Sequence, residues 1–249
     1  MKVAILGMGN MGKAIYTKIC DRHQVSVYDI NQTGLPKEAR LINPEQKENF
    51  DFIILSVKPK DIGKLKNLAW QGDIISIAAG VDHGFLSGVF SGRKIIRLMP
   101  NTPLLVDAGI SGVFLDPEYT GEQKERARAF LEEFTAIVVV DKEELMDAIT
   151  ALSGCGPAYG FLFIEGLADG GVRCGLSRQD AYKLAASTLL GAAKMILETG
   201  KHPGELKDMV TSPAGSTIEG VALLEERGLR SSAMEAVTRA FLKTRNMLG

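Results

Sequence analysis

The sequence predicts an α/β protein in which a Rossmann-type, mostly parallel sheet domain is followed by an all-helical domain. Three observations support this fold class. Short apolar runs alternate with polar spacers from Lys2 to Asp141, a GxGxxG sequence follows the first run, and the β-branched runs stop after Asp141. We therefore expect two domains, residues 1–142 and residues 143–249.

Seven apolar runs in the first domain are short and rich in β-branched residues, and most are bounded by Gly, Pro, Asp or Asn. Such runs alternate with helix-like spacers when the strands are buried on both faces of a parallel sheet. We expect strands at Val3–Leu6, Val25–Tyr28, Phe52–Val57, Ile74–Ala78, Ile95–Leu98, Val113–Leu115 and Ile137–Val140.

After the seventh run, apolar residues recur at helical spacing between recognisable caps. A helix is expected over Pro157–Arg173, because proline is favoured in the first turn. Ser177, with Asp180 three residues later, is typical of a capped helix start. Gly200 and Gly228 are expected to end helices.

The helix expected from Pro157 to Arg173 contains four glycines, each of which costs about 1 kcal/mol relative to alanine in a helix. Close approach of another helix would compensate for this cost, and it predicts that two copies of the chain pair through the second domain. Chance tolerance of glycine is the alternative. The glycines are Gly160, Gly166, Gly170 and Gly171.

The charge of the chain is nearly balanced, with a formal net charge of -1 and interleaved basic and acidic residues. This pattern provides no basic surface for nucleic acid or for anionic lipid, so we expect neither partner. The first apolar run begins directly after Lys2, which leaves no room for a signal peptide. The stretch from Gly160 to Val172 is too short to cross a bilayer. A cytoplasmic protein is expected.

Three cysteines, Cys20, Cys155 and Cys174, are few and have no CxxC spacing. This argues against a disulfide framework and against a structural zinc site, so we expect no metal and a reducing compartment.

The strongest local motif follows the first strand and opens a helix-like stretch. Its residues are Gly7, Met8, Gly9, Asn10, Met11 and Gly12. In this context Gly7 permits a tight turn, Gly9 lets the backbone approach a pyrophosphate, and Gly12 lets the helix pack on the strand. The phosphates would meet N–H groups at the positive end of the helix. A glycine turn without ligand is the alternative.

Asp29 follows the second strand, twenty positions after Gly9, where a carboxylate can accept hydrogen bonds from the adenosine ribose. It would repel a 2′-phosphate by about 1 kcal/mol in water and about 4 kcal/mol at a protein surface. We expect NAD(P)H as cofactor, with a preference for NADH. Alternatively, Asp29 caps the following turn at Asn31 and leaves Lys37 or Arg40 to bind a phosphate.

Four further stretches, together with the glycine motif, resemble pyrroline-5-carboxylate reductases in the expected order over nearly the whole chain. They are Ser56 to Pro59, Arg97 to Pro103, Leu152 to Tyr159, and His202 to Glu219. The last stretch resembles the family signature, a loop between two helices that holds the carboxylate and ring of the substrate.

The signature loop also has a physical interpretation. Its Pro213, Ala214 and Gly215 break a helix, and Ser216 or Thr217 is expected to cap the next one. A helix start rich in N–H groups and hydroxyls suits a carboxylate, although capping alone would explain the same residues. The sequence departs from relatives at three positions without a change in charge. Ala214 stands where they often have glycine, Ser216 where they often have threonine or alanine, and Cys155 where they often have serine.

The resemblance implies reduction of 1-pyrroline-5-carboxylate to L-proline by hydride transfer from NAD(P)H to the C=N carbon, the last step of proline biosynthesis. Thr217 would hydrogen-bond the ring nitrogen or relay its proton, with Ser212 supporting it. Gly215, Ser216 and Thr217 would hold the carboxylate. Because an imine is readily protonated, no strong acid is required, and positioning would dominate catalysis.

Further cofactor contacts are implied by the resemblance. Lys58 could also be considered as a base, but a lysine before proline at a strand end suits binding. Asn43 would lie near the adenosine ribose. The remaining positions are Val57, Lys58 and Pro59 through their backbone, and Ala78, Ala79 and Asn101 near the nicotinamide.

Two other functions remain open. A dehydrogenase of the β-hydroxyacid type has the same two-domain plan, but Gly160 and Ile164 stand where its catalytic lysine and asparagine would be. A non-catalytic dinucleotide-binding protein would not need the Ser212–Thr217 loop. The helical domain is expected to form a homodimer, or a higher oligomer, as the resemblance also implies.

Overall fold

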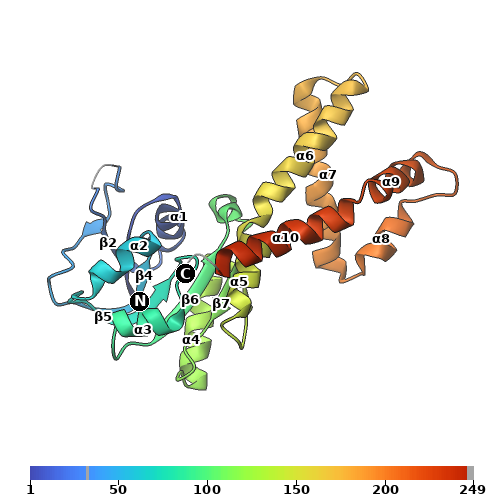
Figure 1. Ribbon diagram of the computed structural model, residues 1–249. Helices are drawn as coiled ribbons and strands as arrows, with labels where there is room; N and C mark the ends of the chain where they lie inside the picture. The colour runs from blue at the N-terminus through green and yellow to red at the C-terminus, as the bar shows by residue number, and fades with distance from the viewer. Residues whose placement is uncertain (32–33, 246–249) are drawn as a thin grey trace. The chain divides into compact units, whose positions relative to one another are not determined.

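The computed structural model describes residues 1–31 and 34–245, so the last four residues of the expected second domain lie outside the described residues. The chain forms two compact units (Figure 1). One comprises residues 1–155 together with the chain from Arg239 onward, and the other comprises residues 156–238.

An eight-stranded sheet forms the first unit in the described part of the chain. All neighbouring strands are parallel except β6 and β7, which confirms the Rossmann-type, mostly parallel sheet. Each of the seven expected runs contributes a strand, and a two-residue strand, β3, joins them at one edge. In spatial order the strands are β3 (Arg40–Leu41), β2 (Gln24–Tyr28), β1 (Lys2–Leu6), β4 (Asn49–Leu55), β5 (Gln71–Ser76), β6 (Ile95–Pro100), β7 (Ile110–Phe114) and β8 (Ala136–Val139).

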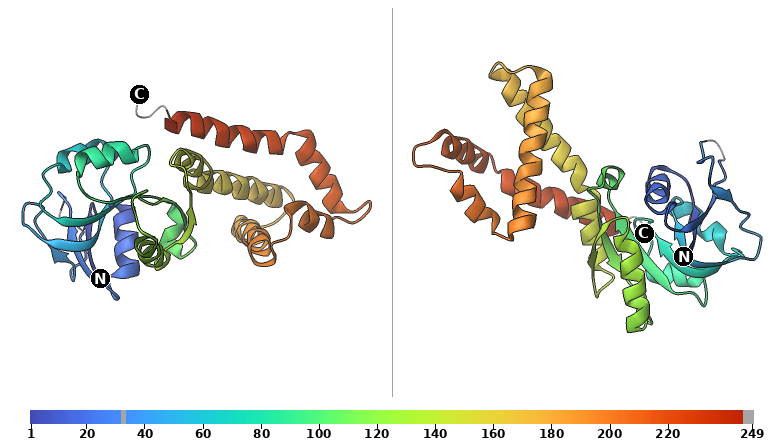
Figure 2. Two further views of the ribbon diagram at one scale, coloured as in Figure 1. Left: turned by 90° about the horizontal axis from the view of Figure 1, so that it is seen from below. Right: turned by 180° about the vertical axis from the view of Figure 1, so that it is seen from behind.

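Helices cover both faces of this sheet (Figures 1 and 2). On one face, the aromatic ring of Phe52 stacks on that of Phe130 at 4.8 Å. The other face buries Trp70 completely. Because both faces are covered, the central strands are apolar almost throughout. The helices are α1 (Asn10–Ile19) and α4 (Gly121–Glu132) on the first face, and α2 (Pro59–Ile62) and α3 (His83–Val89) on the second.

Short helical turns complete the first unit. Two 3₁₀ turns, η1 (Gly63–Leu65) and η2 (Thr102–Val106), follow α2 and β6. After β8, helix α5 (Leu145–Ile149) continues into a π-helical turn, η3 (Thr150–Gly154). A π turn is rare and leaves one extra residue in the helix.

The second unit is helical, as expected (Figure 1). The side-chain oxygen of Ser177 accepts a hydrogen bond from Asp180 N at 3.1 Å, which confirms the expected cap. Gly200 and Gly228 have φ of +65° and +71°, so both stop a helix in the left-handed conformation. The helices are α6 (Gly156–Arg173), α7 (Arg178–Thr199), α8 (Pro203–Met209), α9 (Ser216–Glu226) and α10 (Leu229–Arg245), the last of which ends in the first unit.

No helix among the described residues is long and apolar enough to cross a membrane.

Candidate functional site

The glycine-rich loop between β1 and α1 needs glycine for three separate reasons. Gly7 has φ of +93°, and a β-carbon there would lie 2.5 Å from the carbonyl oxygen of Ser56. A β-carbon on Gly12 would collide with the carbonyl oxygen of Gly7. Among the described residues, no atom lies within 4 Å of the corresponding position at Gly9. The loop is therefore closed against the protein at Gly7 and Gly12 and open at Gly9, as a backbone that approaches a pyrophosphate requires.

The start of α1 adds a positive electrostatic end to this loop. Gly9 is its N-cap, and no side chain accepts a hydrogen bond from the N–H groups of the first turn. The first turn also contains no acidic residue. Phosphate oxygens could accept these N–H bonds, and the helix dipole would favour their charge.

A hollow of about 550 Å³ opens beside the loop at the carboxyl ends of β1, β2 and β4. It brings together five residues expected to bind the cofactor, namely Gly7, Gly9, Asp29, Val57 and Lys58. Lys58 is the N-cap of α2, and Pro59 is the first residue of that helix.

Two cations in the same hollow were not expected. Lys60 and Lys64 line it from α2 and η1. Lys64 Nζ lies 2.6 Å from Asp61 Oδ1, and this hydrogen bond lowers the pKa of the Asp61 carboxyl below its usual value. The i, i+4 spacing of the two lysines after a strand end was the available signal. Together with Lys58, they make the hollow suitable for a pyrophosphate.

Asp29 is held by the backbone on both of its oxygens. Oδ2 accepts the N–H of Met8 at 2.6 Å, and Oδ1 accepts the N–H of Asn31 at 2.8 Å. The Asn31 contact is the turn-capping bond of the alternative interpretation, whereas the Met8 contact keeps the carboxylate against the glycine-rich loop. Arg40, which the alternative offered to a phosphate, lies 2.7 Å from Glu48 in an ion pair.

Asn43 lies in a neighbouring hollow of about 440 Å³, which Asp29 also lines. Its side-chain oxygen accepts the N–H of Glu45 at 2.9 Å, and its carbonyl oxygen accepts the indole N–H of Trp70 at 3.0 Å. Asn43 therefore shapes the wall of this hollow through a turn, close to the place expected for the adenosine ribose.

The residues expected near the nicotinamide follow β5 and β6 at the same edge of the sheet. Ala78 is buried, and its N–H lies 3.4 Å from the Ser76 hydroxyl. Ala79 is half-buried. Asn101 is buried, and its side-chain oxygen accepts the N–H of Ile110 at 3.0 Å. Asn101 thus supports the start of β7 from the carboxyl end of β6.

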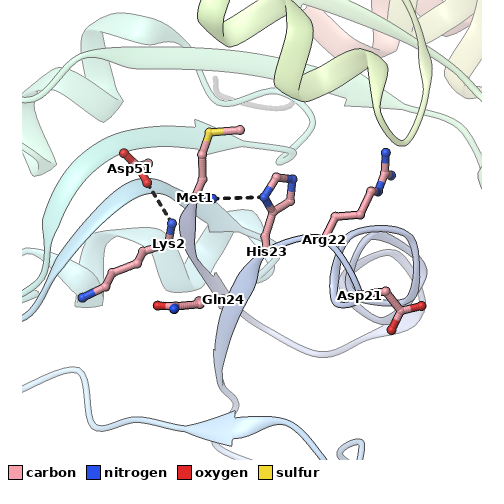
Figure 3. A pocket seen from close by; sticks show the side chains of 7 residues that line it. All are labelled: Met1, Lys2, Asp21, Arg22, His23, Gln24 and Asp51. Carbon is pink, nitrogen blue, oxygen red and sulfur yellow. Dashed lines mark hydrogen bonds between the residues drawn. The ribbon is translucent and has the colours of Figure 1, made fainter.

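A further hollow of about 520 Å³ lies at the opposite edge, where β1 and β2 begin (Figure 3). Two pairs of its lining residues hydrogen-bond with each other. The terminal amine of Met1 lies 3.2 Å from His23 Nδ1, and the Lys2 N–H donates to Asp51 Oδ2 at 2.8 Å. Parallel sheets bind ligands at their carboxyl edge, so we place the cofactor site at the glycine-rich loop and not here.

In the helical unit, the loop between α8 and α9 brings Ser212 next to Gly215, whose N–H donates to the Ser212 carbonyl at 3.1 Å. A β-carbon on Gly215 would collide with the Ser212 hydroxyl. The expectation that Ser216 or Thr217 caps the helix was wrong. Gly215 is the N-cap, without a side-chain hydrogen bond, because its extended backbone already starts the helix at Ser216.

The hydroxyls of this loop are available to a ligand. Ser212, Ser216 and Thr217 are exposed, and their side chains make no hydrogen bond within the described residues. With the uncapped N–H groups at the start of α9, they form a set of donors that suits a carboxylate.

The family models that match this chain agree with its two-part organisation. Residues 143–247 match the model described as pyrroline-5-carboxylate reductase dimerisation. Residues 2–80 match the model described as NADP oxidoreductase, coenzyme F420-dependent.

Full-length relatives carry the same name. A pyrroline-5-carboxylate reductase from Methanosarcina acetivorans is 41% identical, over 99% of this chain and 97% of its own length. That from Escherichia coli is 38% identical, over 99% and 98%. A solved reductase from Coxiella burnetii is 31% identical over 98% of this chain and 97% of its own, with a TM-score of 0.90. One from Plasmodium falciparum with NADP bound is 30% identical over 99% and 98%, with a TM-score of 0.85. The chain belongs to the pyrroline-5-carboxylate reductase family.

Proposed function

We propose that this protein is an NAD(P)H-dependent oxidoreductase that reduces 1-pyrroline-5-carboxylate to L-proline, the last step of proline biosynthesis. The observation that carries this proposal is the loop Ser212–Thr217, whose free hydroxyls and uncapped helix start stand in a chain similar over its whole length to reductases of that name.

The glycine-rich loop fits a dinucleotide, because β-carbons are excluded at Gly7 and Gly12 while Gly9 stays open. When bound, the nicotinamide supplies the hydride. The protein holds the pyrophosphate with N–H groups of α1 and with Lys58, and Asn10 and Met11 bring the first turn of that helix to it. Met8 is buried and keeps Asp29 in place through its N–H.

We assign the substrate to the loop before α9. Gly215, Ser216 and Thr217 hold the carboxylate with N–H and hydroxyl groups, and Thr217 donates to the ring nitrogen or relays its proton. Ser212 supports Thr217. The imine carries its own electron sink once it is protonated, so these residues contribute mainly by orientation.

We propose a preference for NADH over NADPH. Support comes from Asp29, which the Met8 N–H fixes at the loop, and from Arg40, which Glu48 neutralises. A 2′-phosphate would therefore meet a carboxylate before it met a free arginine. The Plasmodium falciparum relative has NADP bound. The proposed preference for NADH is therefore a property of this chain and not of every member of the family.

We propose that the chain divides at residue 142 into two functional domains. Residues 1–142 bind the cofactor. Residues 143–249 bind the substrate and form a homodimer, or a higher oligomer built from such dimers. Among the described residues of the helical unit, the buried apolar core consists of Ala168, Ala181 and Ala185, with Ile164 and Val172 partly buried against it. Many large apolar side chains of this unit are exposed. A second copy would cover them.

The net charge of the chain and its free cysteines support the expected kind of partner and the expected compartment. A net charge of -1 supports a small-molecule substrate and not nucleic acid or membrane. The thiols of Cys20, Cys155 and Cys174 are all free, which supports the reducing cytoplasm.

One assay separates the three functions considered. The first measurement follows the loss of NADH or NADPH fluorescence after 1-pyrroline-5-carboxylate is added. The second follows the gain of that fluorescence when the protein is given oxidised cofactor and a 3-hydroxy acid. We expect turnover with the imine alone. Turnover with the hydroxy acid alone would show a β-hydroxyacid dehydrogenase. Cofactor binding without turnover of either compound would show a non-catalytic protein.

A further inference from the structure

The segment from Glu143 to Gly154 lies across one face of strands β6 and β7. Arg97 and Met99 are two residues apart in β6 and therefore point to the same face. Gly112 of β7 is the direct partner of Met99 in the antiparallel register, so it shares that face. Residues 143, 149 and 154 each contact one of these three positions. The segment is thus attached at its beginning, middle and end.

The first attachment is an ion pair between a buried arginine and a half-buried glutamate. Arg97 Nη1 donates to Glu143 Oε1 at 2.7 Å, and the same oxygen accepts the N–H of His83 at 2.5 Å. The Arg97 side chain is only 8% exposed. A buried guanidinium that loses its carboxylate partner is strongly unfavourable. Arg97 therefore holds Glu143 against strand β6.

The other two attachments are close approaches at glycine. A β-carbon on Gly112 would lie 2.5 Å from Ile149 Cγ2, so only glycine lets α5 approach β7 this closely. A β-carbon on Gly154 would lie 3.0 Å from Met99 Cε. The π turn η3 brings Gly154 to Met99, because its extra residue shifts the end of the helix.

We propose that Arg97 and Glu143 are positioning residues for hydride transfer, in addition to the residues that touch cofactor or substrate. Strand β6 leads two residues after Met99 to Asn101, at the nicotinamide end of the proposed cofactor site. The segment it holds leads directly into α6 and the helical unit that contains the substrate loop. The pair therefore holds the segment that leads out of the sheet unit against β6. This inference rests on the proposed function.

The test compares Glu143→Gln with Glu144→Gln. Glu144 is adjacent, carries the same charge and makes no ion pair within the described residues. Both glutamates line a cavity of about 300 Å³ that Arg97 also lines. We expect Glu143→Gln to lower kcat by about 10- to 100-fold, as misplacement far from the reacting atoms does. The Kd for NADH, measured by fluorescence titration, should change by less than about twofold. Glu144→Gln should leave both values unchanged.

A double-mutant cycle with Arg97→Met separates positioning from general destabilisation. If the pair acts as a unit, the double variant loses no more kcat than the worse single variant. Arg97→Lys keeps the charge and should retain more kcat than Arg97→Met. All rates are compared at equal folded fraction, checked by circular dichroism. If Glu143→Gln folds poorly, Glu143→Asp replaces it.

Three outcomes would overturn the inference: losses that multiply in the double variant, an NADH affinity that falls as much as kcat, or equal effects of Glu143→Gln and Glu144→Gln. Failure of the proposed function has a different signature, because the unmodified protein would then not turn over 1-pyrroline-5-carboxylate. In that case the same cycle measured by urea unfolding decides whether the pair is coupled at all, and absence of coupling overturns it.

Discussion

Thr217 stands at the second position of α9 with an exposed hydroxyl that makes no hydrogen bond within the described residues. If it donates to the ring nitrogen, Thr217→Ala should lower kcat/KM for 1-pyrroline-5-carboxylate by about tenfold to several hundredfold, the size of one charge-assisted contact. Thr217→Ser keeps the hydroxyl and should retain most of the activity. Steady-state kinetics measure both variants, and an unchanged kcat/KM for the alanine variant would contradict the role.

Asp29 should decide the cofactor preference. The unmodified protein is expected to have the higher kcat/KM with NADH. Asp29→Asn removes the charge that faces a 2′-phosphate and should raise the NADPH to NADH ratio of kcat/KM by about one to two decades. Asp61→Asn is the matched control, because Asp61 lines the same hollow and is already paired with Lys64. An equal or better kcat/KM with NADPH in the unmodified protein would refute the preference.

Residues with backbone requirements were the most predictable ones. The roles of Gly7 and Gly12 follow from spacing, because sterics at a strand–turn–helix leave few solutions. Lys60 and Lys64 were missed because their i, i+4 spacing is a weak signal when the helix α2 that begins it is only four residues long. The contacts of a carboxylate such as Asp29 depend on which hydrogen-bond donors lie within a few ångström of it. The spacing of residues along the chain does not define these positions.

At the scale of elements, the turn into α9 contains a strained residue. Ala214 has φ of +54°, in the left-handed region, which costs about 1–2 kcal/mol for a residue with a β-carbon. Ala214→Gly relieves this strain. It also raises the conformational entropy of the unfolded chain, which lowers the free energy of unfolding by about 0.4–1 kcal/mol. We expect a net increase of up to about 1 kcal/mol in the free energy of unfolding, measured in urea. Ala222→Gly, in the middle of α9, should instead lower it by about 1 kcal/mol.

Asp116 ties α3, β6 and the loop after β7 together. Burial opposes its charge, but the N–H groups of Ile95 at 2.8 Å and Glu118 at 2.9 Å, together with His83, outweigh burial and lower the pKa of the carboxyl. The bonds therefore stabilise the fold above the unfolded pKa of about 3.9, and this stability is lost as pH falls through the lower folded pKa.

Asp116→Asn should accordingly reduce the free energy of unfolding by about 1–3 kcal/mol at neutral pH. The difference from the unmodified protein should shrink as pH falls from about 4 through the lower folded pKa of Asp116, because below that pKa both chains carry a neutral group. Urea unfolding at several pH values measures it. Glu118→Gln, an exposed partner of Lys94, should cost less than about 1 kcal/mol. A deficit that stays constant with pH would contradict this account.

Elements of the sheet were predictable because strands buried on both faces are apolar throughout. Strand β3 has two residues, both exposed, and could not be recognised by composition. The start of α9 was misjudged because hydroxyl residues are the usual caps, whereas here Gly215 adopts the extended cap conformation itself. The π turn before α6 also left no mark in the apolar pattern.

At the scale of the whole molecule, the helical unit exposes many large apolar side chains, whereas its buried core consists of alanines. Leu162 in α6 is 71% exposed, and Leu190 in α7 is 68% exposed. Among the described residues, four glycines of α6 have open space where a β-carbon would stand, which allows another backbone to approach; they are Gly156, Gly160, Gly166 and Gly170. Gly171 instead contacts Leu176 and Ala181 of its own unit. These features support a paired helical unit.

Leu162→Asp and Leu190→Asp should shift the protein from dimer to monomer in sedimentation analysis, because a buried charge at the interface would be unpaired. The Tm of the unmodified protein should rise with concentration, and that dependence should be lost in the variants. Phe85→Asp, at a 48% exposed position of α3 in the sheet unit, is the control and should leave the mass unchanged. A dimeric Leu162→Asp/Leu190→Asp double variant would place the interface elsewhere.

The boundary between the two units also shows what the spacing of apolar residues cannot predict. Strands stop at residue 139, yet packing on the sheet continues to Cys155, since Glu143, Ile149 and Gly154 contact β6 and β7. A pattern of apolar residues marks a change of secondary structure, but only contacts define the unit to which a helix belongs.

The end of α10 has a consequence for biosynthesis. Thr244 is 6% exposed and belongs to the sheet unit, although α10 begins in the helical unit. On the ribosome, the sheet unit therefore cannot be completed when its own strands have emerged. It must wait until the whole helical unit has been translated and the last turn of α10 has left the exit tunnel. We expect nascent chains that end at Cys155 to be more sensitive to protease than the released full-length protein.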